Sequence, residues 1–364
     1  MAEHDRRPLA RGSDAARDAA SIASAPSSVR GAVDHRERAS RRASHWLALF
    51  FIALALVFAV FAWATGDTFF FRLATESLIF GGFAMSVDLL LGFTGLLSLG
   101  QALFFGLGAY GSALVLKEIT PSFWLAIGVT LAAATLVGAI AGFIAIRARG
   151  VYFALITFGL AEVVSKIVFN TRELGGSDGI IGIPVVAANF GVFSVDAANA
   201  PAFFLLMLVV IMAIYFSLAY LLSTPFGRLM DAVRVNESRV SFLGFDPRTI
   251  KWISFVLAAD VAALSGAFYP MLRGFVSPEL MYFTASGNAV ITVIVGGVGT
   301  LIGPLYGSVI LFGLKSVIGT FTEHHLIVIG LLFMASVIFL PKGLVGALHP
   351  RLAAWAVRRA RPRK

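Results

Sequence analysis

Apolar runs of about twenty residues alternate with short polar segments along most of the chain, and a helix needs about that length to cross the hydrocarbon layer of a membrane. The pattern predicts an all-α polytopic integral membrane protein with about ten transmembrane helices. The predicted spans are 46–65, 70–91, 94–116, 123–146, 151–169, 201–222, 252–272, 284–299, 301–319 and 325–341.

Two of these spans, 94–116 and 284–299, are short or interrupted by glycine. A glycine cluster lies in or beside each of them: Gly92, Gly95, Gly100, Gly106 and Gly108 in the first half, and Gly296, Gly297, Gly299, Gly303 and Gly307 in the second. Their recurrence indicates broken or re-entrant helices in a pseudo-repeat, an arrangement that surrounds the substrate pathway in many transporters. Glycine-rich packing faces between regular helices explain the same pattern.

The composition agrees with a membrane location. Hydrophobic residues make up 58% of the 364 residues and charged residues only 13%, whereas soluble domains carry about 25% charged residues. The absence of cysteine excludes a disulfide and a thiolate metal site. Neither a GxxxxGK[ST] loop nor an HExxH motif occurs. We therefore expect no catalytic residue and no metal site in this chain, which is not an enzyme on this interpretation.

Basic residues gather in clusters that fall on one side of an alternating membrane path. The clusters are Arg41 and Arg42, Arg147 and Arg149, the segment 224–251, and the tail from Lys342 to Lys364. The positive-inside rule places such clusters in the cytosol, which gives an even number of spans and two cytosolic termini. The net charge of +9 is then a topology signal, and we expect no nucleic-acid partner.

This path divides the chain into three parts. Residues 1–45 are rich in Ala, Ser and Arg and are predicted to form a disordered cytosolic tail. Residues 46–341 form the transmembrane domain, in which 170–200 is a long loop on the outer side of the membrane. Residues 342–364 form a basic cytosolic tail.

The polar stretch 224–251 between the sixth and seventh spans is the most distinctive segment. Apolar residues recur within it at roughly helical spacing until Gly244, and the pair Asp246-Pro247 can cap and start the next helix. We predict two short surface helices, joined at Gly244, that are offered to a soluble partner. A solvated basic loop is the alternative.

Polar side chains within the predicted spans are costly in lipid and are therefore candidates for a translocation pathway. They are Asp88, Gln101, Thr157, Glu162, Asp260 and Asn288. Hydrogen bonding between helices explains each one as well as substrate contact does, but their distribution over several spans favours a polar pathway. Arg72 and Glu76, four residues apart, are predicted to form a local ion pair.

Eight stretches, spread in order over most of the chain, carry a family resemblance. They are LLLGFTGLLSLGQALFFGLGAYGSAL (89–114), RARGVYFALITFGLAEVV (147–164), GGSDGIIGIP (175–184), VRVNESRVSFLGFDPRTIKWISFVLAA (233–259), LSGAFY (264–269), VSPEL (276–280), VIVGGVGTLIGPLYGSVI (293–310) and FLPKGLVG (339–346). Together they resemble the membrane subunits of branched-chain amino-acid ABC importers of the LivM type, which are related to urea-importer permeases.

The resemblance implies a permease subunit of an ATP-binding-cassette importer for branched-chain or related amino acids in the bacterial inner membrane. Its implied partners are a second homologous permease, two ATP-binding subunits, a periplasmic solute-binding protein and membrane lipid. ATP and Mg would be bound by the ATPase subunits, so no cofactor is expected in this chain. In such importers a cytosolic loop docks on the ATPase through a Glu…Gly motif, to which Glu237 and Gly244 correspond. The implied coupling residues are Arg228, Arg234, Asn236, Glu237, Gly244 and Asp246.

Two other functions stay open at this point. A permease for urea, short amides or small carboxylates would use the same machinery, because the binding protein largely sets the substrate. A stand-alone ion-coupled secondary transporter would suit broken helices and buried acids. Such a carrier would not need the large loop that contains Glu237 and Gly244.

Overall fold

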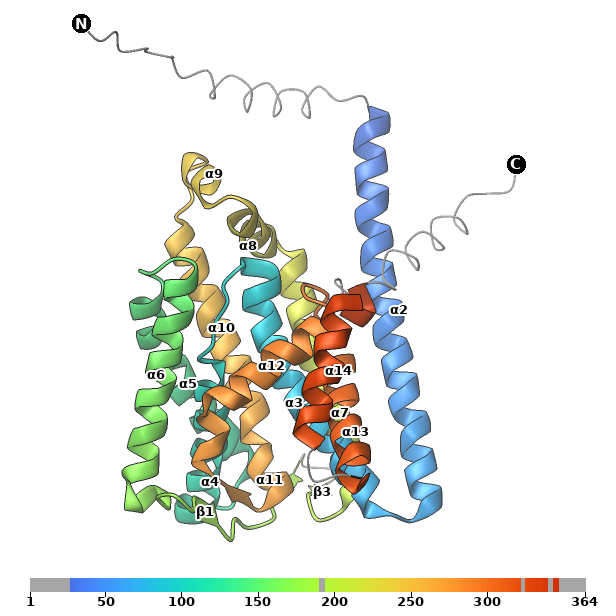
Figure 1. The fold of residues 1–364 in the computed structure, drawn as a ribbon, viewed down its shortest axis with the longest axis vertical. Coiled ribbons are helices and arrows are strands. Elements are labelled where there is room, and N and C mark those ends of the chain that lie inside the picture. The colour runs from blue at the N-terminus through green and yellow to red at the C-terminus, as the bar shows by residue number, and fades with distance from the viewer. Residues whose placement is uncertain (1–26, 190–193, 322–324, 340–342, 347–364) are drawn as a thin grey trace, which may run out of the picture. The chain divides into compact units, whose positions relative to one another are not determined.

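The computed structural model describes residues 27–189, 194–321, 325–339 and 343–346, and these are mostly helical (Figure 1). Residues 47–348 form one unit. A second unit combines residues 1–46 and 349–364, and of it the structure describes only the first part of helix α2. Of the predicted C-terminal tail, 342–364, only 343–346 lie within the described residues.

The predicted fold class is confirmed, because eight helices of the described chain are long and apolar enough to cross a membrane. They are built on α2 (Ser27–Thr65), α3 (Thr68–Asp88), α4 (Gln101–Leu114), α5 (Phe123–Ala145), α6 (Val151–Asn170), α7 (Ala200–Ser223), α10 (Pro247–Ala267) and α13 (Gly303–Phe321). Two shorter apolar helices are α12 (Phe283–Gly296) and α14 (His325–Phe339). Each predicted span overlaps one of these helices.

The N-terminal prediction needs one correction. Residues 1–45 were expected to be disordered, but the described part of this segment is helical from Ser27 onward. The sequence there is rich in Arg and Ala, which favour a helix even without an apolar face. The remaining residues, 1–26, lie outside the described chain.

Helices α3 and α10 form the centre of the bundle. Helix α3 packs against α7, α10, α12 and α13, and α10 packs against α4 and α5 as well. Helices α3 and α10 both carry many small residues. Helix α10 also packs very closely on α4, and the backbones of these two helices touch at two positions. Any side-chain carbon on Gly108 would meet the Ala263 carbonyl, and one on Gly266 would meet the Phe105 carbonyl. Glycine therefore fixes how closely these two helices approach.

The two spans predicted to be irregular, 94–116 and 284–299, contain the short continuous helices α4 and α12, and a break lies at one end of each. In the first, α3 continues into a π-helical turn, η1 (Leu89–Thr94), which ends at Gly95 with a φ of +74°, and α4 begins only at Gln101. In the second, 297–302 separate α12 from α13. The breaks meet where Gly92 packs on Gly299.

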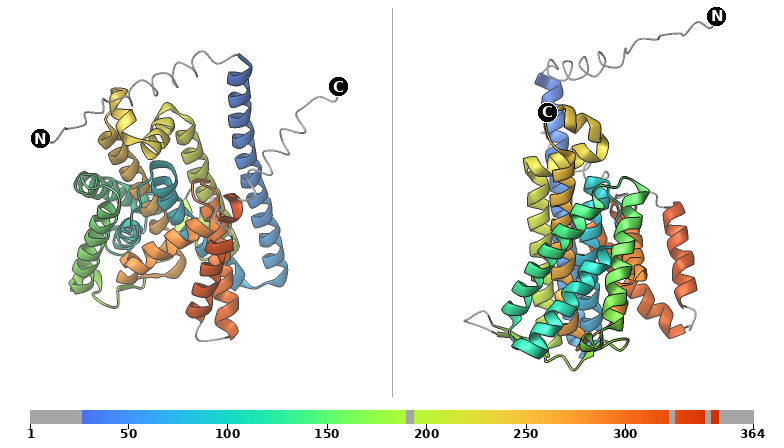
Figure 2. Two further views of the ribbon diagram at one scale, coloured as in Figure 1. Left: turned by 45° about the horizontal axis from the view of Figure 1, so that its top comes forward. Right: turned by 90° about the vertical axis from the view of Figure 1, so that its left-hand side faces the viewer.

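The end of the bundle opposite the short helices α8 (Pro225–Val235) and α9 (Glu237–Phe242) is closed by short segments (Figures 1 and 2). They are η2 (Val115–Ile119), η3 (Arg172–Leu174), α11 (Tyr269–Arg273), η4 (Pro278–Met281) and the strand pairs β1 (Ile180–Ile181) with β4 (Phe275–Val276) and β2 (Ala187–Asn189) with β3 (Ser194–Asp196). Antiparallel pairing of β1 with β4 joins the loop after α6 to the segment after α11.

An ion pair at this end corrects the sequence analysis. Glu76 bonds Arg273 of α11 instead of Arg72, its neighbour along α3. The chain reversal after α10 brings this distant guanidinium to the half-buried carboxylate. Spacing along one helix could not reveal a partner from another element.

Candidate functional site

The coupling segment consists of α8 and α9 and lies between α7 and α10 at one end of the bundle (Figure 1). Its turns follow the local sequence. The Asn236 side chain accepts the Arg239 N–H at 3.1 Å and so caps the start of α9. Gly244 has a φ of +86°, a left-handed conformation that glycine adopts without strain. Two short helices are present, but the predicted joint is wrong: they meet at Asn236, whereas Gly244 separates α9 from the long helix α10.

Asp246 caps the beginning of α10. One carboxylate oxygen accepts the Arg248 N–H at 3.1 Å, and the other accepts the Thr249 N–H at 3.2 Å and its hydroxyl at 2.7 Å. The Thr249 hydroxyl, aided by these amides, lowers the pKa of Asp246 below its usual value. Asp246 thus stays ionised and fixes the direction in which α10 leaves the coupling segment.

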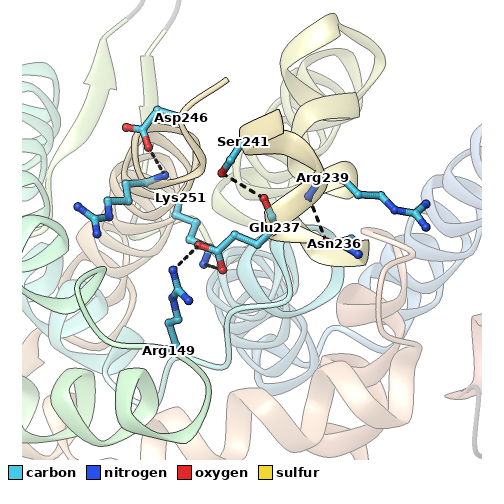
Figure 3. A network of polar contacts seen from close by, with 8 residues as sticks. Arg149, Asn236, Glu237, Arg239, Ser241, Asp246 and Lys251 are labelled. Atoms are coloured by element: carbon cyan, nitrogen blue, oxygen red, sulfur yellow. Dashed lines mark hydrogen bonds and ion pairs between the residues drawn. The ribbon is translucent and has the colours of Figure 1, made fainter. Parts of the chain in front are cut away.

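Glu237 fastens the coupling segment to the bundle (Figure 3). One of its oxygens lies 2.7 Å from the Lys251 ammonium of α10, and the other lies 3.9 Å from the Arg149 guanidinium, between α5 and α6. The Lys251 side chain is only 8% exposed, and that of Glu237 is 28% exposed. Glu237 therefore points inward, toward its own chain. Arg149, Glu237 and Asp246 also line a small cavity of about 240 Å³.

The segment exposes a group of apolar side chains. Phe242 is 90% exposed and Leu243 is 74% exposed, and Val235 and Phe245 are also exposed. Charged side chains surround them, so these residues lie in a polar part of the chain. An apolar cluster of this kind, ringed by polar residues, is typical of a protein-binding surface.

The remaining predicted coupling residues lie on α8. Arg228 and Arg234 line one side of a cavity of about 540 Å³, together with Asp231. Gly92 and Gly299, at the two helix breaks, line its other side. Helix α8 therefore packs directly on the first break and faces the second across this cavity.

The structure brings two predicted pathway residues together, Gln101 and Thr157. The Leu99 N–H donates to the Thr157 hydroxyl at 3.2 Å, which joins α6 to the segment before α4. Beside it, the Ala102 N–H donates to the Ser286 hydroxyl of α12 at 2.9 Å. Gln101 itself is fully buried, and neither polar atom of its side chain has a partner within the described chain. An unpaired buried amide is costly, and it would be satisfied by a polar ligand or water in another state.

Asp88 lies elsewhere, between the two breaks. It is fully buried, and its two oxygens accept the N–H groups of Gly299 at 2.6 Å and Leu301 at 2.9 Å. This geometry joins the end of α3 to the connection between α12 and α13.

The other three predicted pathway residues are spread over separate elements. Asp260 is half-buried between α10 and α5 and accepts the Thr135 hydroxyl at 2.8 Å. Glu162 on α6 and Asn288 on α12 are half-buried. A pathway role for these residues remains a prediction.

Several contributing residues were not predicted from the sequence. Arg149, Lys251 and Ser286 depend on contacts between distant segments, and no local pattern identifies them. Phe242 and Leu243 did carry a signal, because they form an apolar pair directly before Gly244 in a polar stretch.

Comparison with known proteins shows the family to which this chain belongs. A model described as the permease component of the branched-chain amino acid transport system matches residues 69–337. The chain is 30% identical over 300 residues to the high-affinity branched-chain amino acid transport system permease protein LivM of Escherichia coli K12, which covers 77% of this chain and 71% of the relative. The LivM protein of Salmonella typhimurium LT2 is 28% identical over 326 residues, covering 84% and 75%.

A probable LivM protein of Methanocaldococcus jannaschii is 24% identical over 184 residues, which are 46% of this chain and 52% of the relative. No solved structure gives a significant match. The family match runs from the start of α3 into α14 and so includes the coupling segment and both helix breaks. The chain therefore belongs to the permease family of branched-chain amino acid transport systems.

Proposed function

We propose that this chain is the permease subunit of an ATP-binding-cassette importer that moves branched-chain or related amino acids across the bacterial inner membrane. Relatives named for branched-chain amino acid transport support the substrate class. A permease for urea, short amides or small carboxylates is the alternative, because a separate binding protein would select the substrate.

The observation that carries the proposal is the coupling segment. It is fastened to the bundle by Glu237 and presents Phe242 and Leu243 outward. A rigid body with an apolar tip can dock in a cleft of a soluble subunit and transmit its movement. ATP and Mg would bind to two such subunits and not to this chain, which would itself catalyse no reaction.

The other proposed partners follow from the two ends of the bundle. The coupling segment would face the cytosol, where both termini would also lie, and loop 170–200 would face a periplasmic solute-binding protein. A second homologous permease would complete the pathway within the lipid. Arg149 and Glu237 belong to two different basic clusters of the sequence, and they lie 3.9 Å apart. Their contact supports the view that both clusters lie at one end of the bundle, as the positive-inside rule expects of the cytosolic face.

A stand-alone secondary transporter is favoured by one observation, the buried unpaired amide of Gln101 beside a broken helix. The coupling segment argues against it, because a carrier driven by an ion gradient does not need to bind a soluble subunit through an exposed apolar tip outside the membrane.

Purification after mild crosslinking tests the proposal. We expect an ATPase, a second permease and a binding protein to copurify with the chain, and uptake in proteoliposomes to require ATP. The double variant Phe242→Ser/Leu243→Ser should lose the ATPase. The matched control is Phe321→Ser, which changes a phenylalanine that is 84% exposed at the end of α13. Recovery of the chain alone, with gradient-driven uptake, would overturn the proposal and favour the secondary transporter.

A further inference from the structure

The break between α12 and α13 is held in a strained conformation. Leu301 has a φ of +58° and is the one residue other than glycine with a positive φ in the described chain. Such a conformation persists only where the surroundings hold it. The Leu301 N–H donates to Asp88, and Thr300 donates to the Gly297 carbonyl. The carboxylate of α3 is thus one of the groups that keep this break in shape.

The first break is in direct contact with the second. A side-chain carbon on Gly92 would lie 2.5 Å from the Gly299 nitrogen and 2.5 Å from an Asp88 oxygen. The packing of Gly92 on Gly299 and the two hydrogen bonds to Asp88 therefore join the two breaks at the same place. Each carboxylate oxygen accepts one of the two N–H groups, whereas an asparagine in the same position would replace one of these oxygens by an NH2 donor.

The coupling segment touches the first break but is separated from the second. Helix α8 packs against η1, and the Arg234 side chain lies over Gly95, where an added carbon would be 3.0 Å from its Cγ. Asp231 holds that guanidinium at 2.7 Å. The cavity of about 540 Å³ lies between α8 and the segment around Val298. A shift of α8 can thus reach the first break directly and has open space toward the second.

We propose that Asp88 is a positioning residue that makes the two helix breaks move as one body when α8 moves. A displacement that enters at Gly95 would pass through Asp88 to Leu301 and so reach both halves of the bundle. This role rests on the proposed function, because the displacement would come from ATP binding to partner subunits docked on the coupling segment.

Introduced cysteines test this transmission, because the chain has none of its own. Ser238→Cys on α9 reports ATPase docking through protection from a thiol reagent. Val298→Cys lies beside the second break and lines the cavity. In the assembled complex we expect ATP to change the labelling rate at Val298→Cys. In the Asp88→Asn variant this ATP response should be lost, whereas protection at Ser238→Cys should remain.

Thr94→Ala is the matched control. It removes a buried hydroxyl whose hydrogen bond goes to the Leu89 carbonyl within η1 and not to the second break. Its ATP response at Val298→Cys should persist. A response that survives in Asp88→Asn, or that is lost equally in Thr94→Ala, would overturn the role of Asp88. Absence of protection at Ser238→Cys in the parent complex would instead overturn the proposed function.

A second measurement keeps Asp88 intact and so does not depend on how well the variant folds. Phe93 and Val298 line the same cavity from the two breaks. Spin labels at Phe93→Cys and Val298→Cys should give the same dipolar broadening with and without bound ATP, because the breaks move together. A change in broadening on ATP binding would show that they move separately and would refute the inference.

Discussion

At the scale of single residues, the sequence marked candidate polar side chains but did not indicate what they contact. Asp88 and Glu76 were recognisable because charges in apolar spans are rare, and Glu237 because it corresponds to the Glu…Gly motif of the family that the sequence resembles. Their partners come from distant parts of the chain: Gly299 and Leu301, Lys251 and Arg149, and Arg273. Local spacing predicted Arg72 for Glu76, and tertiary packing supplied Arg273 instead.

The Glu237–Lys251 pair leads to a prediction about stability. Glu237→Gln leaves the Lys251 ammonium, which is 8% exposed, without its anionic partner. We expect a loss of about 1–3 kcal/mol, since a buried charge without a partner is costly. The double variant Glu237→Gln/Lys251→Met should recover part of this loss. Thermal unfolding of the detergent-solubilised protein measures both.

The exposed pair between Asp231 and Arg234 provides the control for this experiment. It lies on the same segment, and both side chains are about half exposed. Asp231→Asn should change the stability by no more than about 1 kcal/mol, as for other exposed ion pairs. An equal loss in Glu237→Gln and Asp231→Asn would contradict the idea that Glu237 fastens the segment.

At the scale of elements, the sequence predicted the helices better than their interruptions. Apolar length located all eight candidate spans of the described chain, and glycine content marked 94–116 and 284–299 as irregular. The details depend on packing: η1 is π-helical, and α4 begins at Gln101, several residues later than its predicted span. Glycine spacing indicates that a helix can break, whereas the register of the break depends on contacts such as that between Gly92 and Gly299.

The contact between α4 and α10 can be tested with single glycine substitutions. A Cβ on Gly266 would overlap the Phe105 carbonyl, so Gly266→Ala has to push the two helices apart. We expect a loss of about 1–3 kcal/mol, as for other overpacked sites. Thermal unfolding in detergent measures the change.

Gly159→Ala on α6 is the matched control, because nothing lies within 4 Å of the added carbon. Alanine favours a helix over glycine by about 0.5–1 kcal/mol, so this variant should be as stable as the parent or slightly more stable. If Gly266→Ala behaved in the same way, close backbone contact would not determine the packing of α4 on α10.

At the scale of the whole molecule, hydropathy was sufficient for the fold class but not for the arrangement of the helices. Lipid offers no hydrogen-bonding partner to backbone N–H and C=O groups. A long apolar run therefore satisfies these groups within itself by forming a helix. Mean hydropathy does not identify the helix that lies at the centre. The runs that became α3 and α6 are similarly apolar, yet α3 is largely buried and α6 is largely exposed.

The predicted orientation of the bundle leads to a test with two matched cysteines. Ser177 lies in loop 170–200 and Ser238 lies on α9; both are exposed, and α7 is the single candidate span between them in the described chain. If α7 crosses the membrane once, the two thiols lie on opposite sides. A membrane-impermeant maleimide should label Ser177→Cys in intact spheroplasts and Ser238→Cys in inverted vesicles. Labelling of both from one side, in sealed membranes, would mean that α7 does not cross, and loop 170–200 and the coupling segment would then share a face. An ATPase and a periplasmic binding protein could not occupy that face together, so this result would contradict the topology and the importer assignment at once.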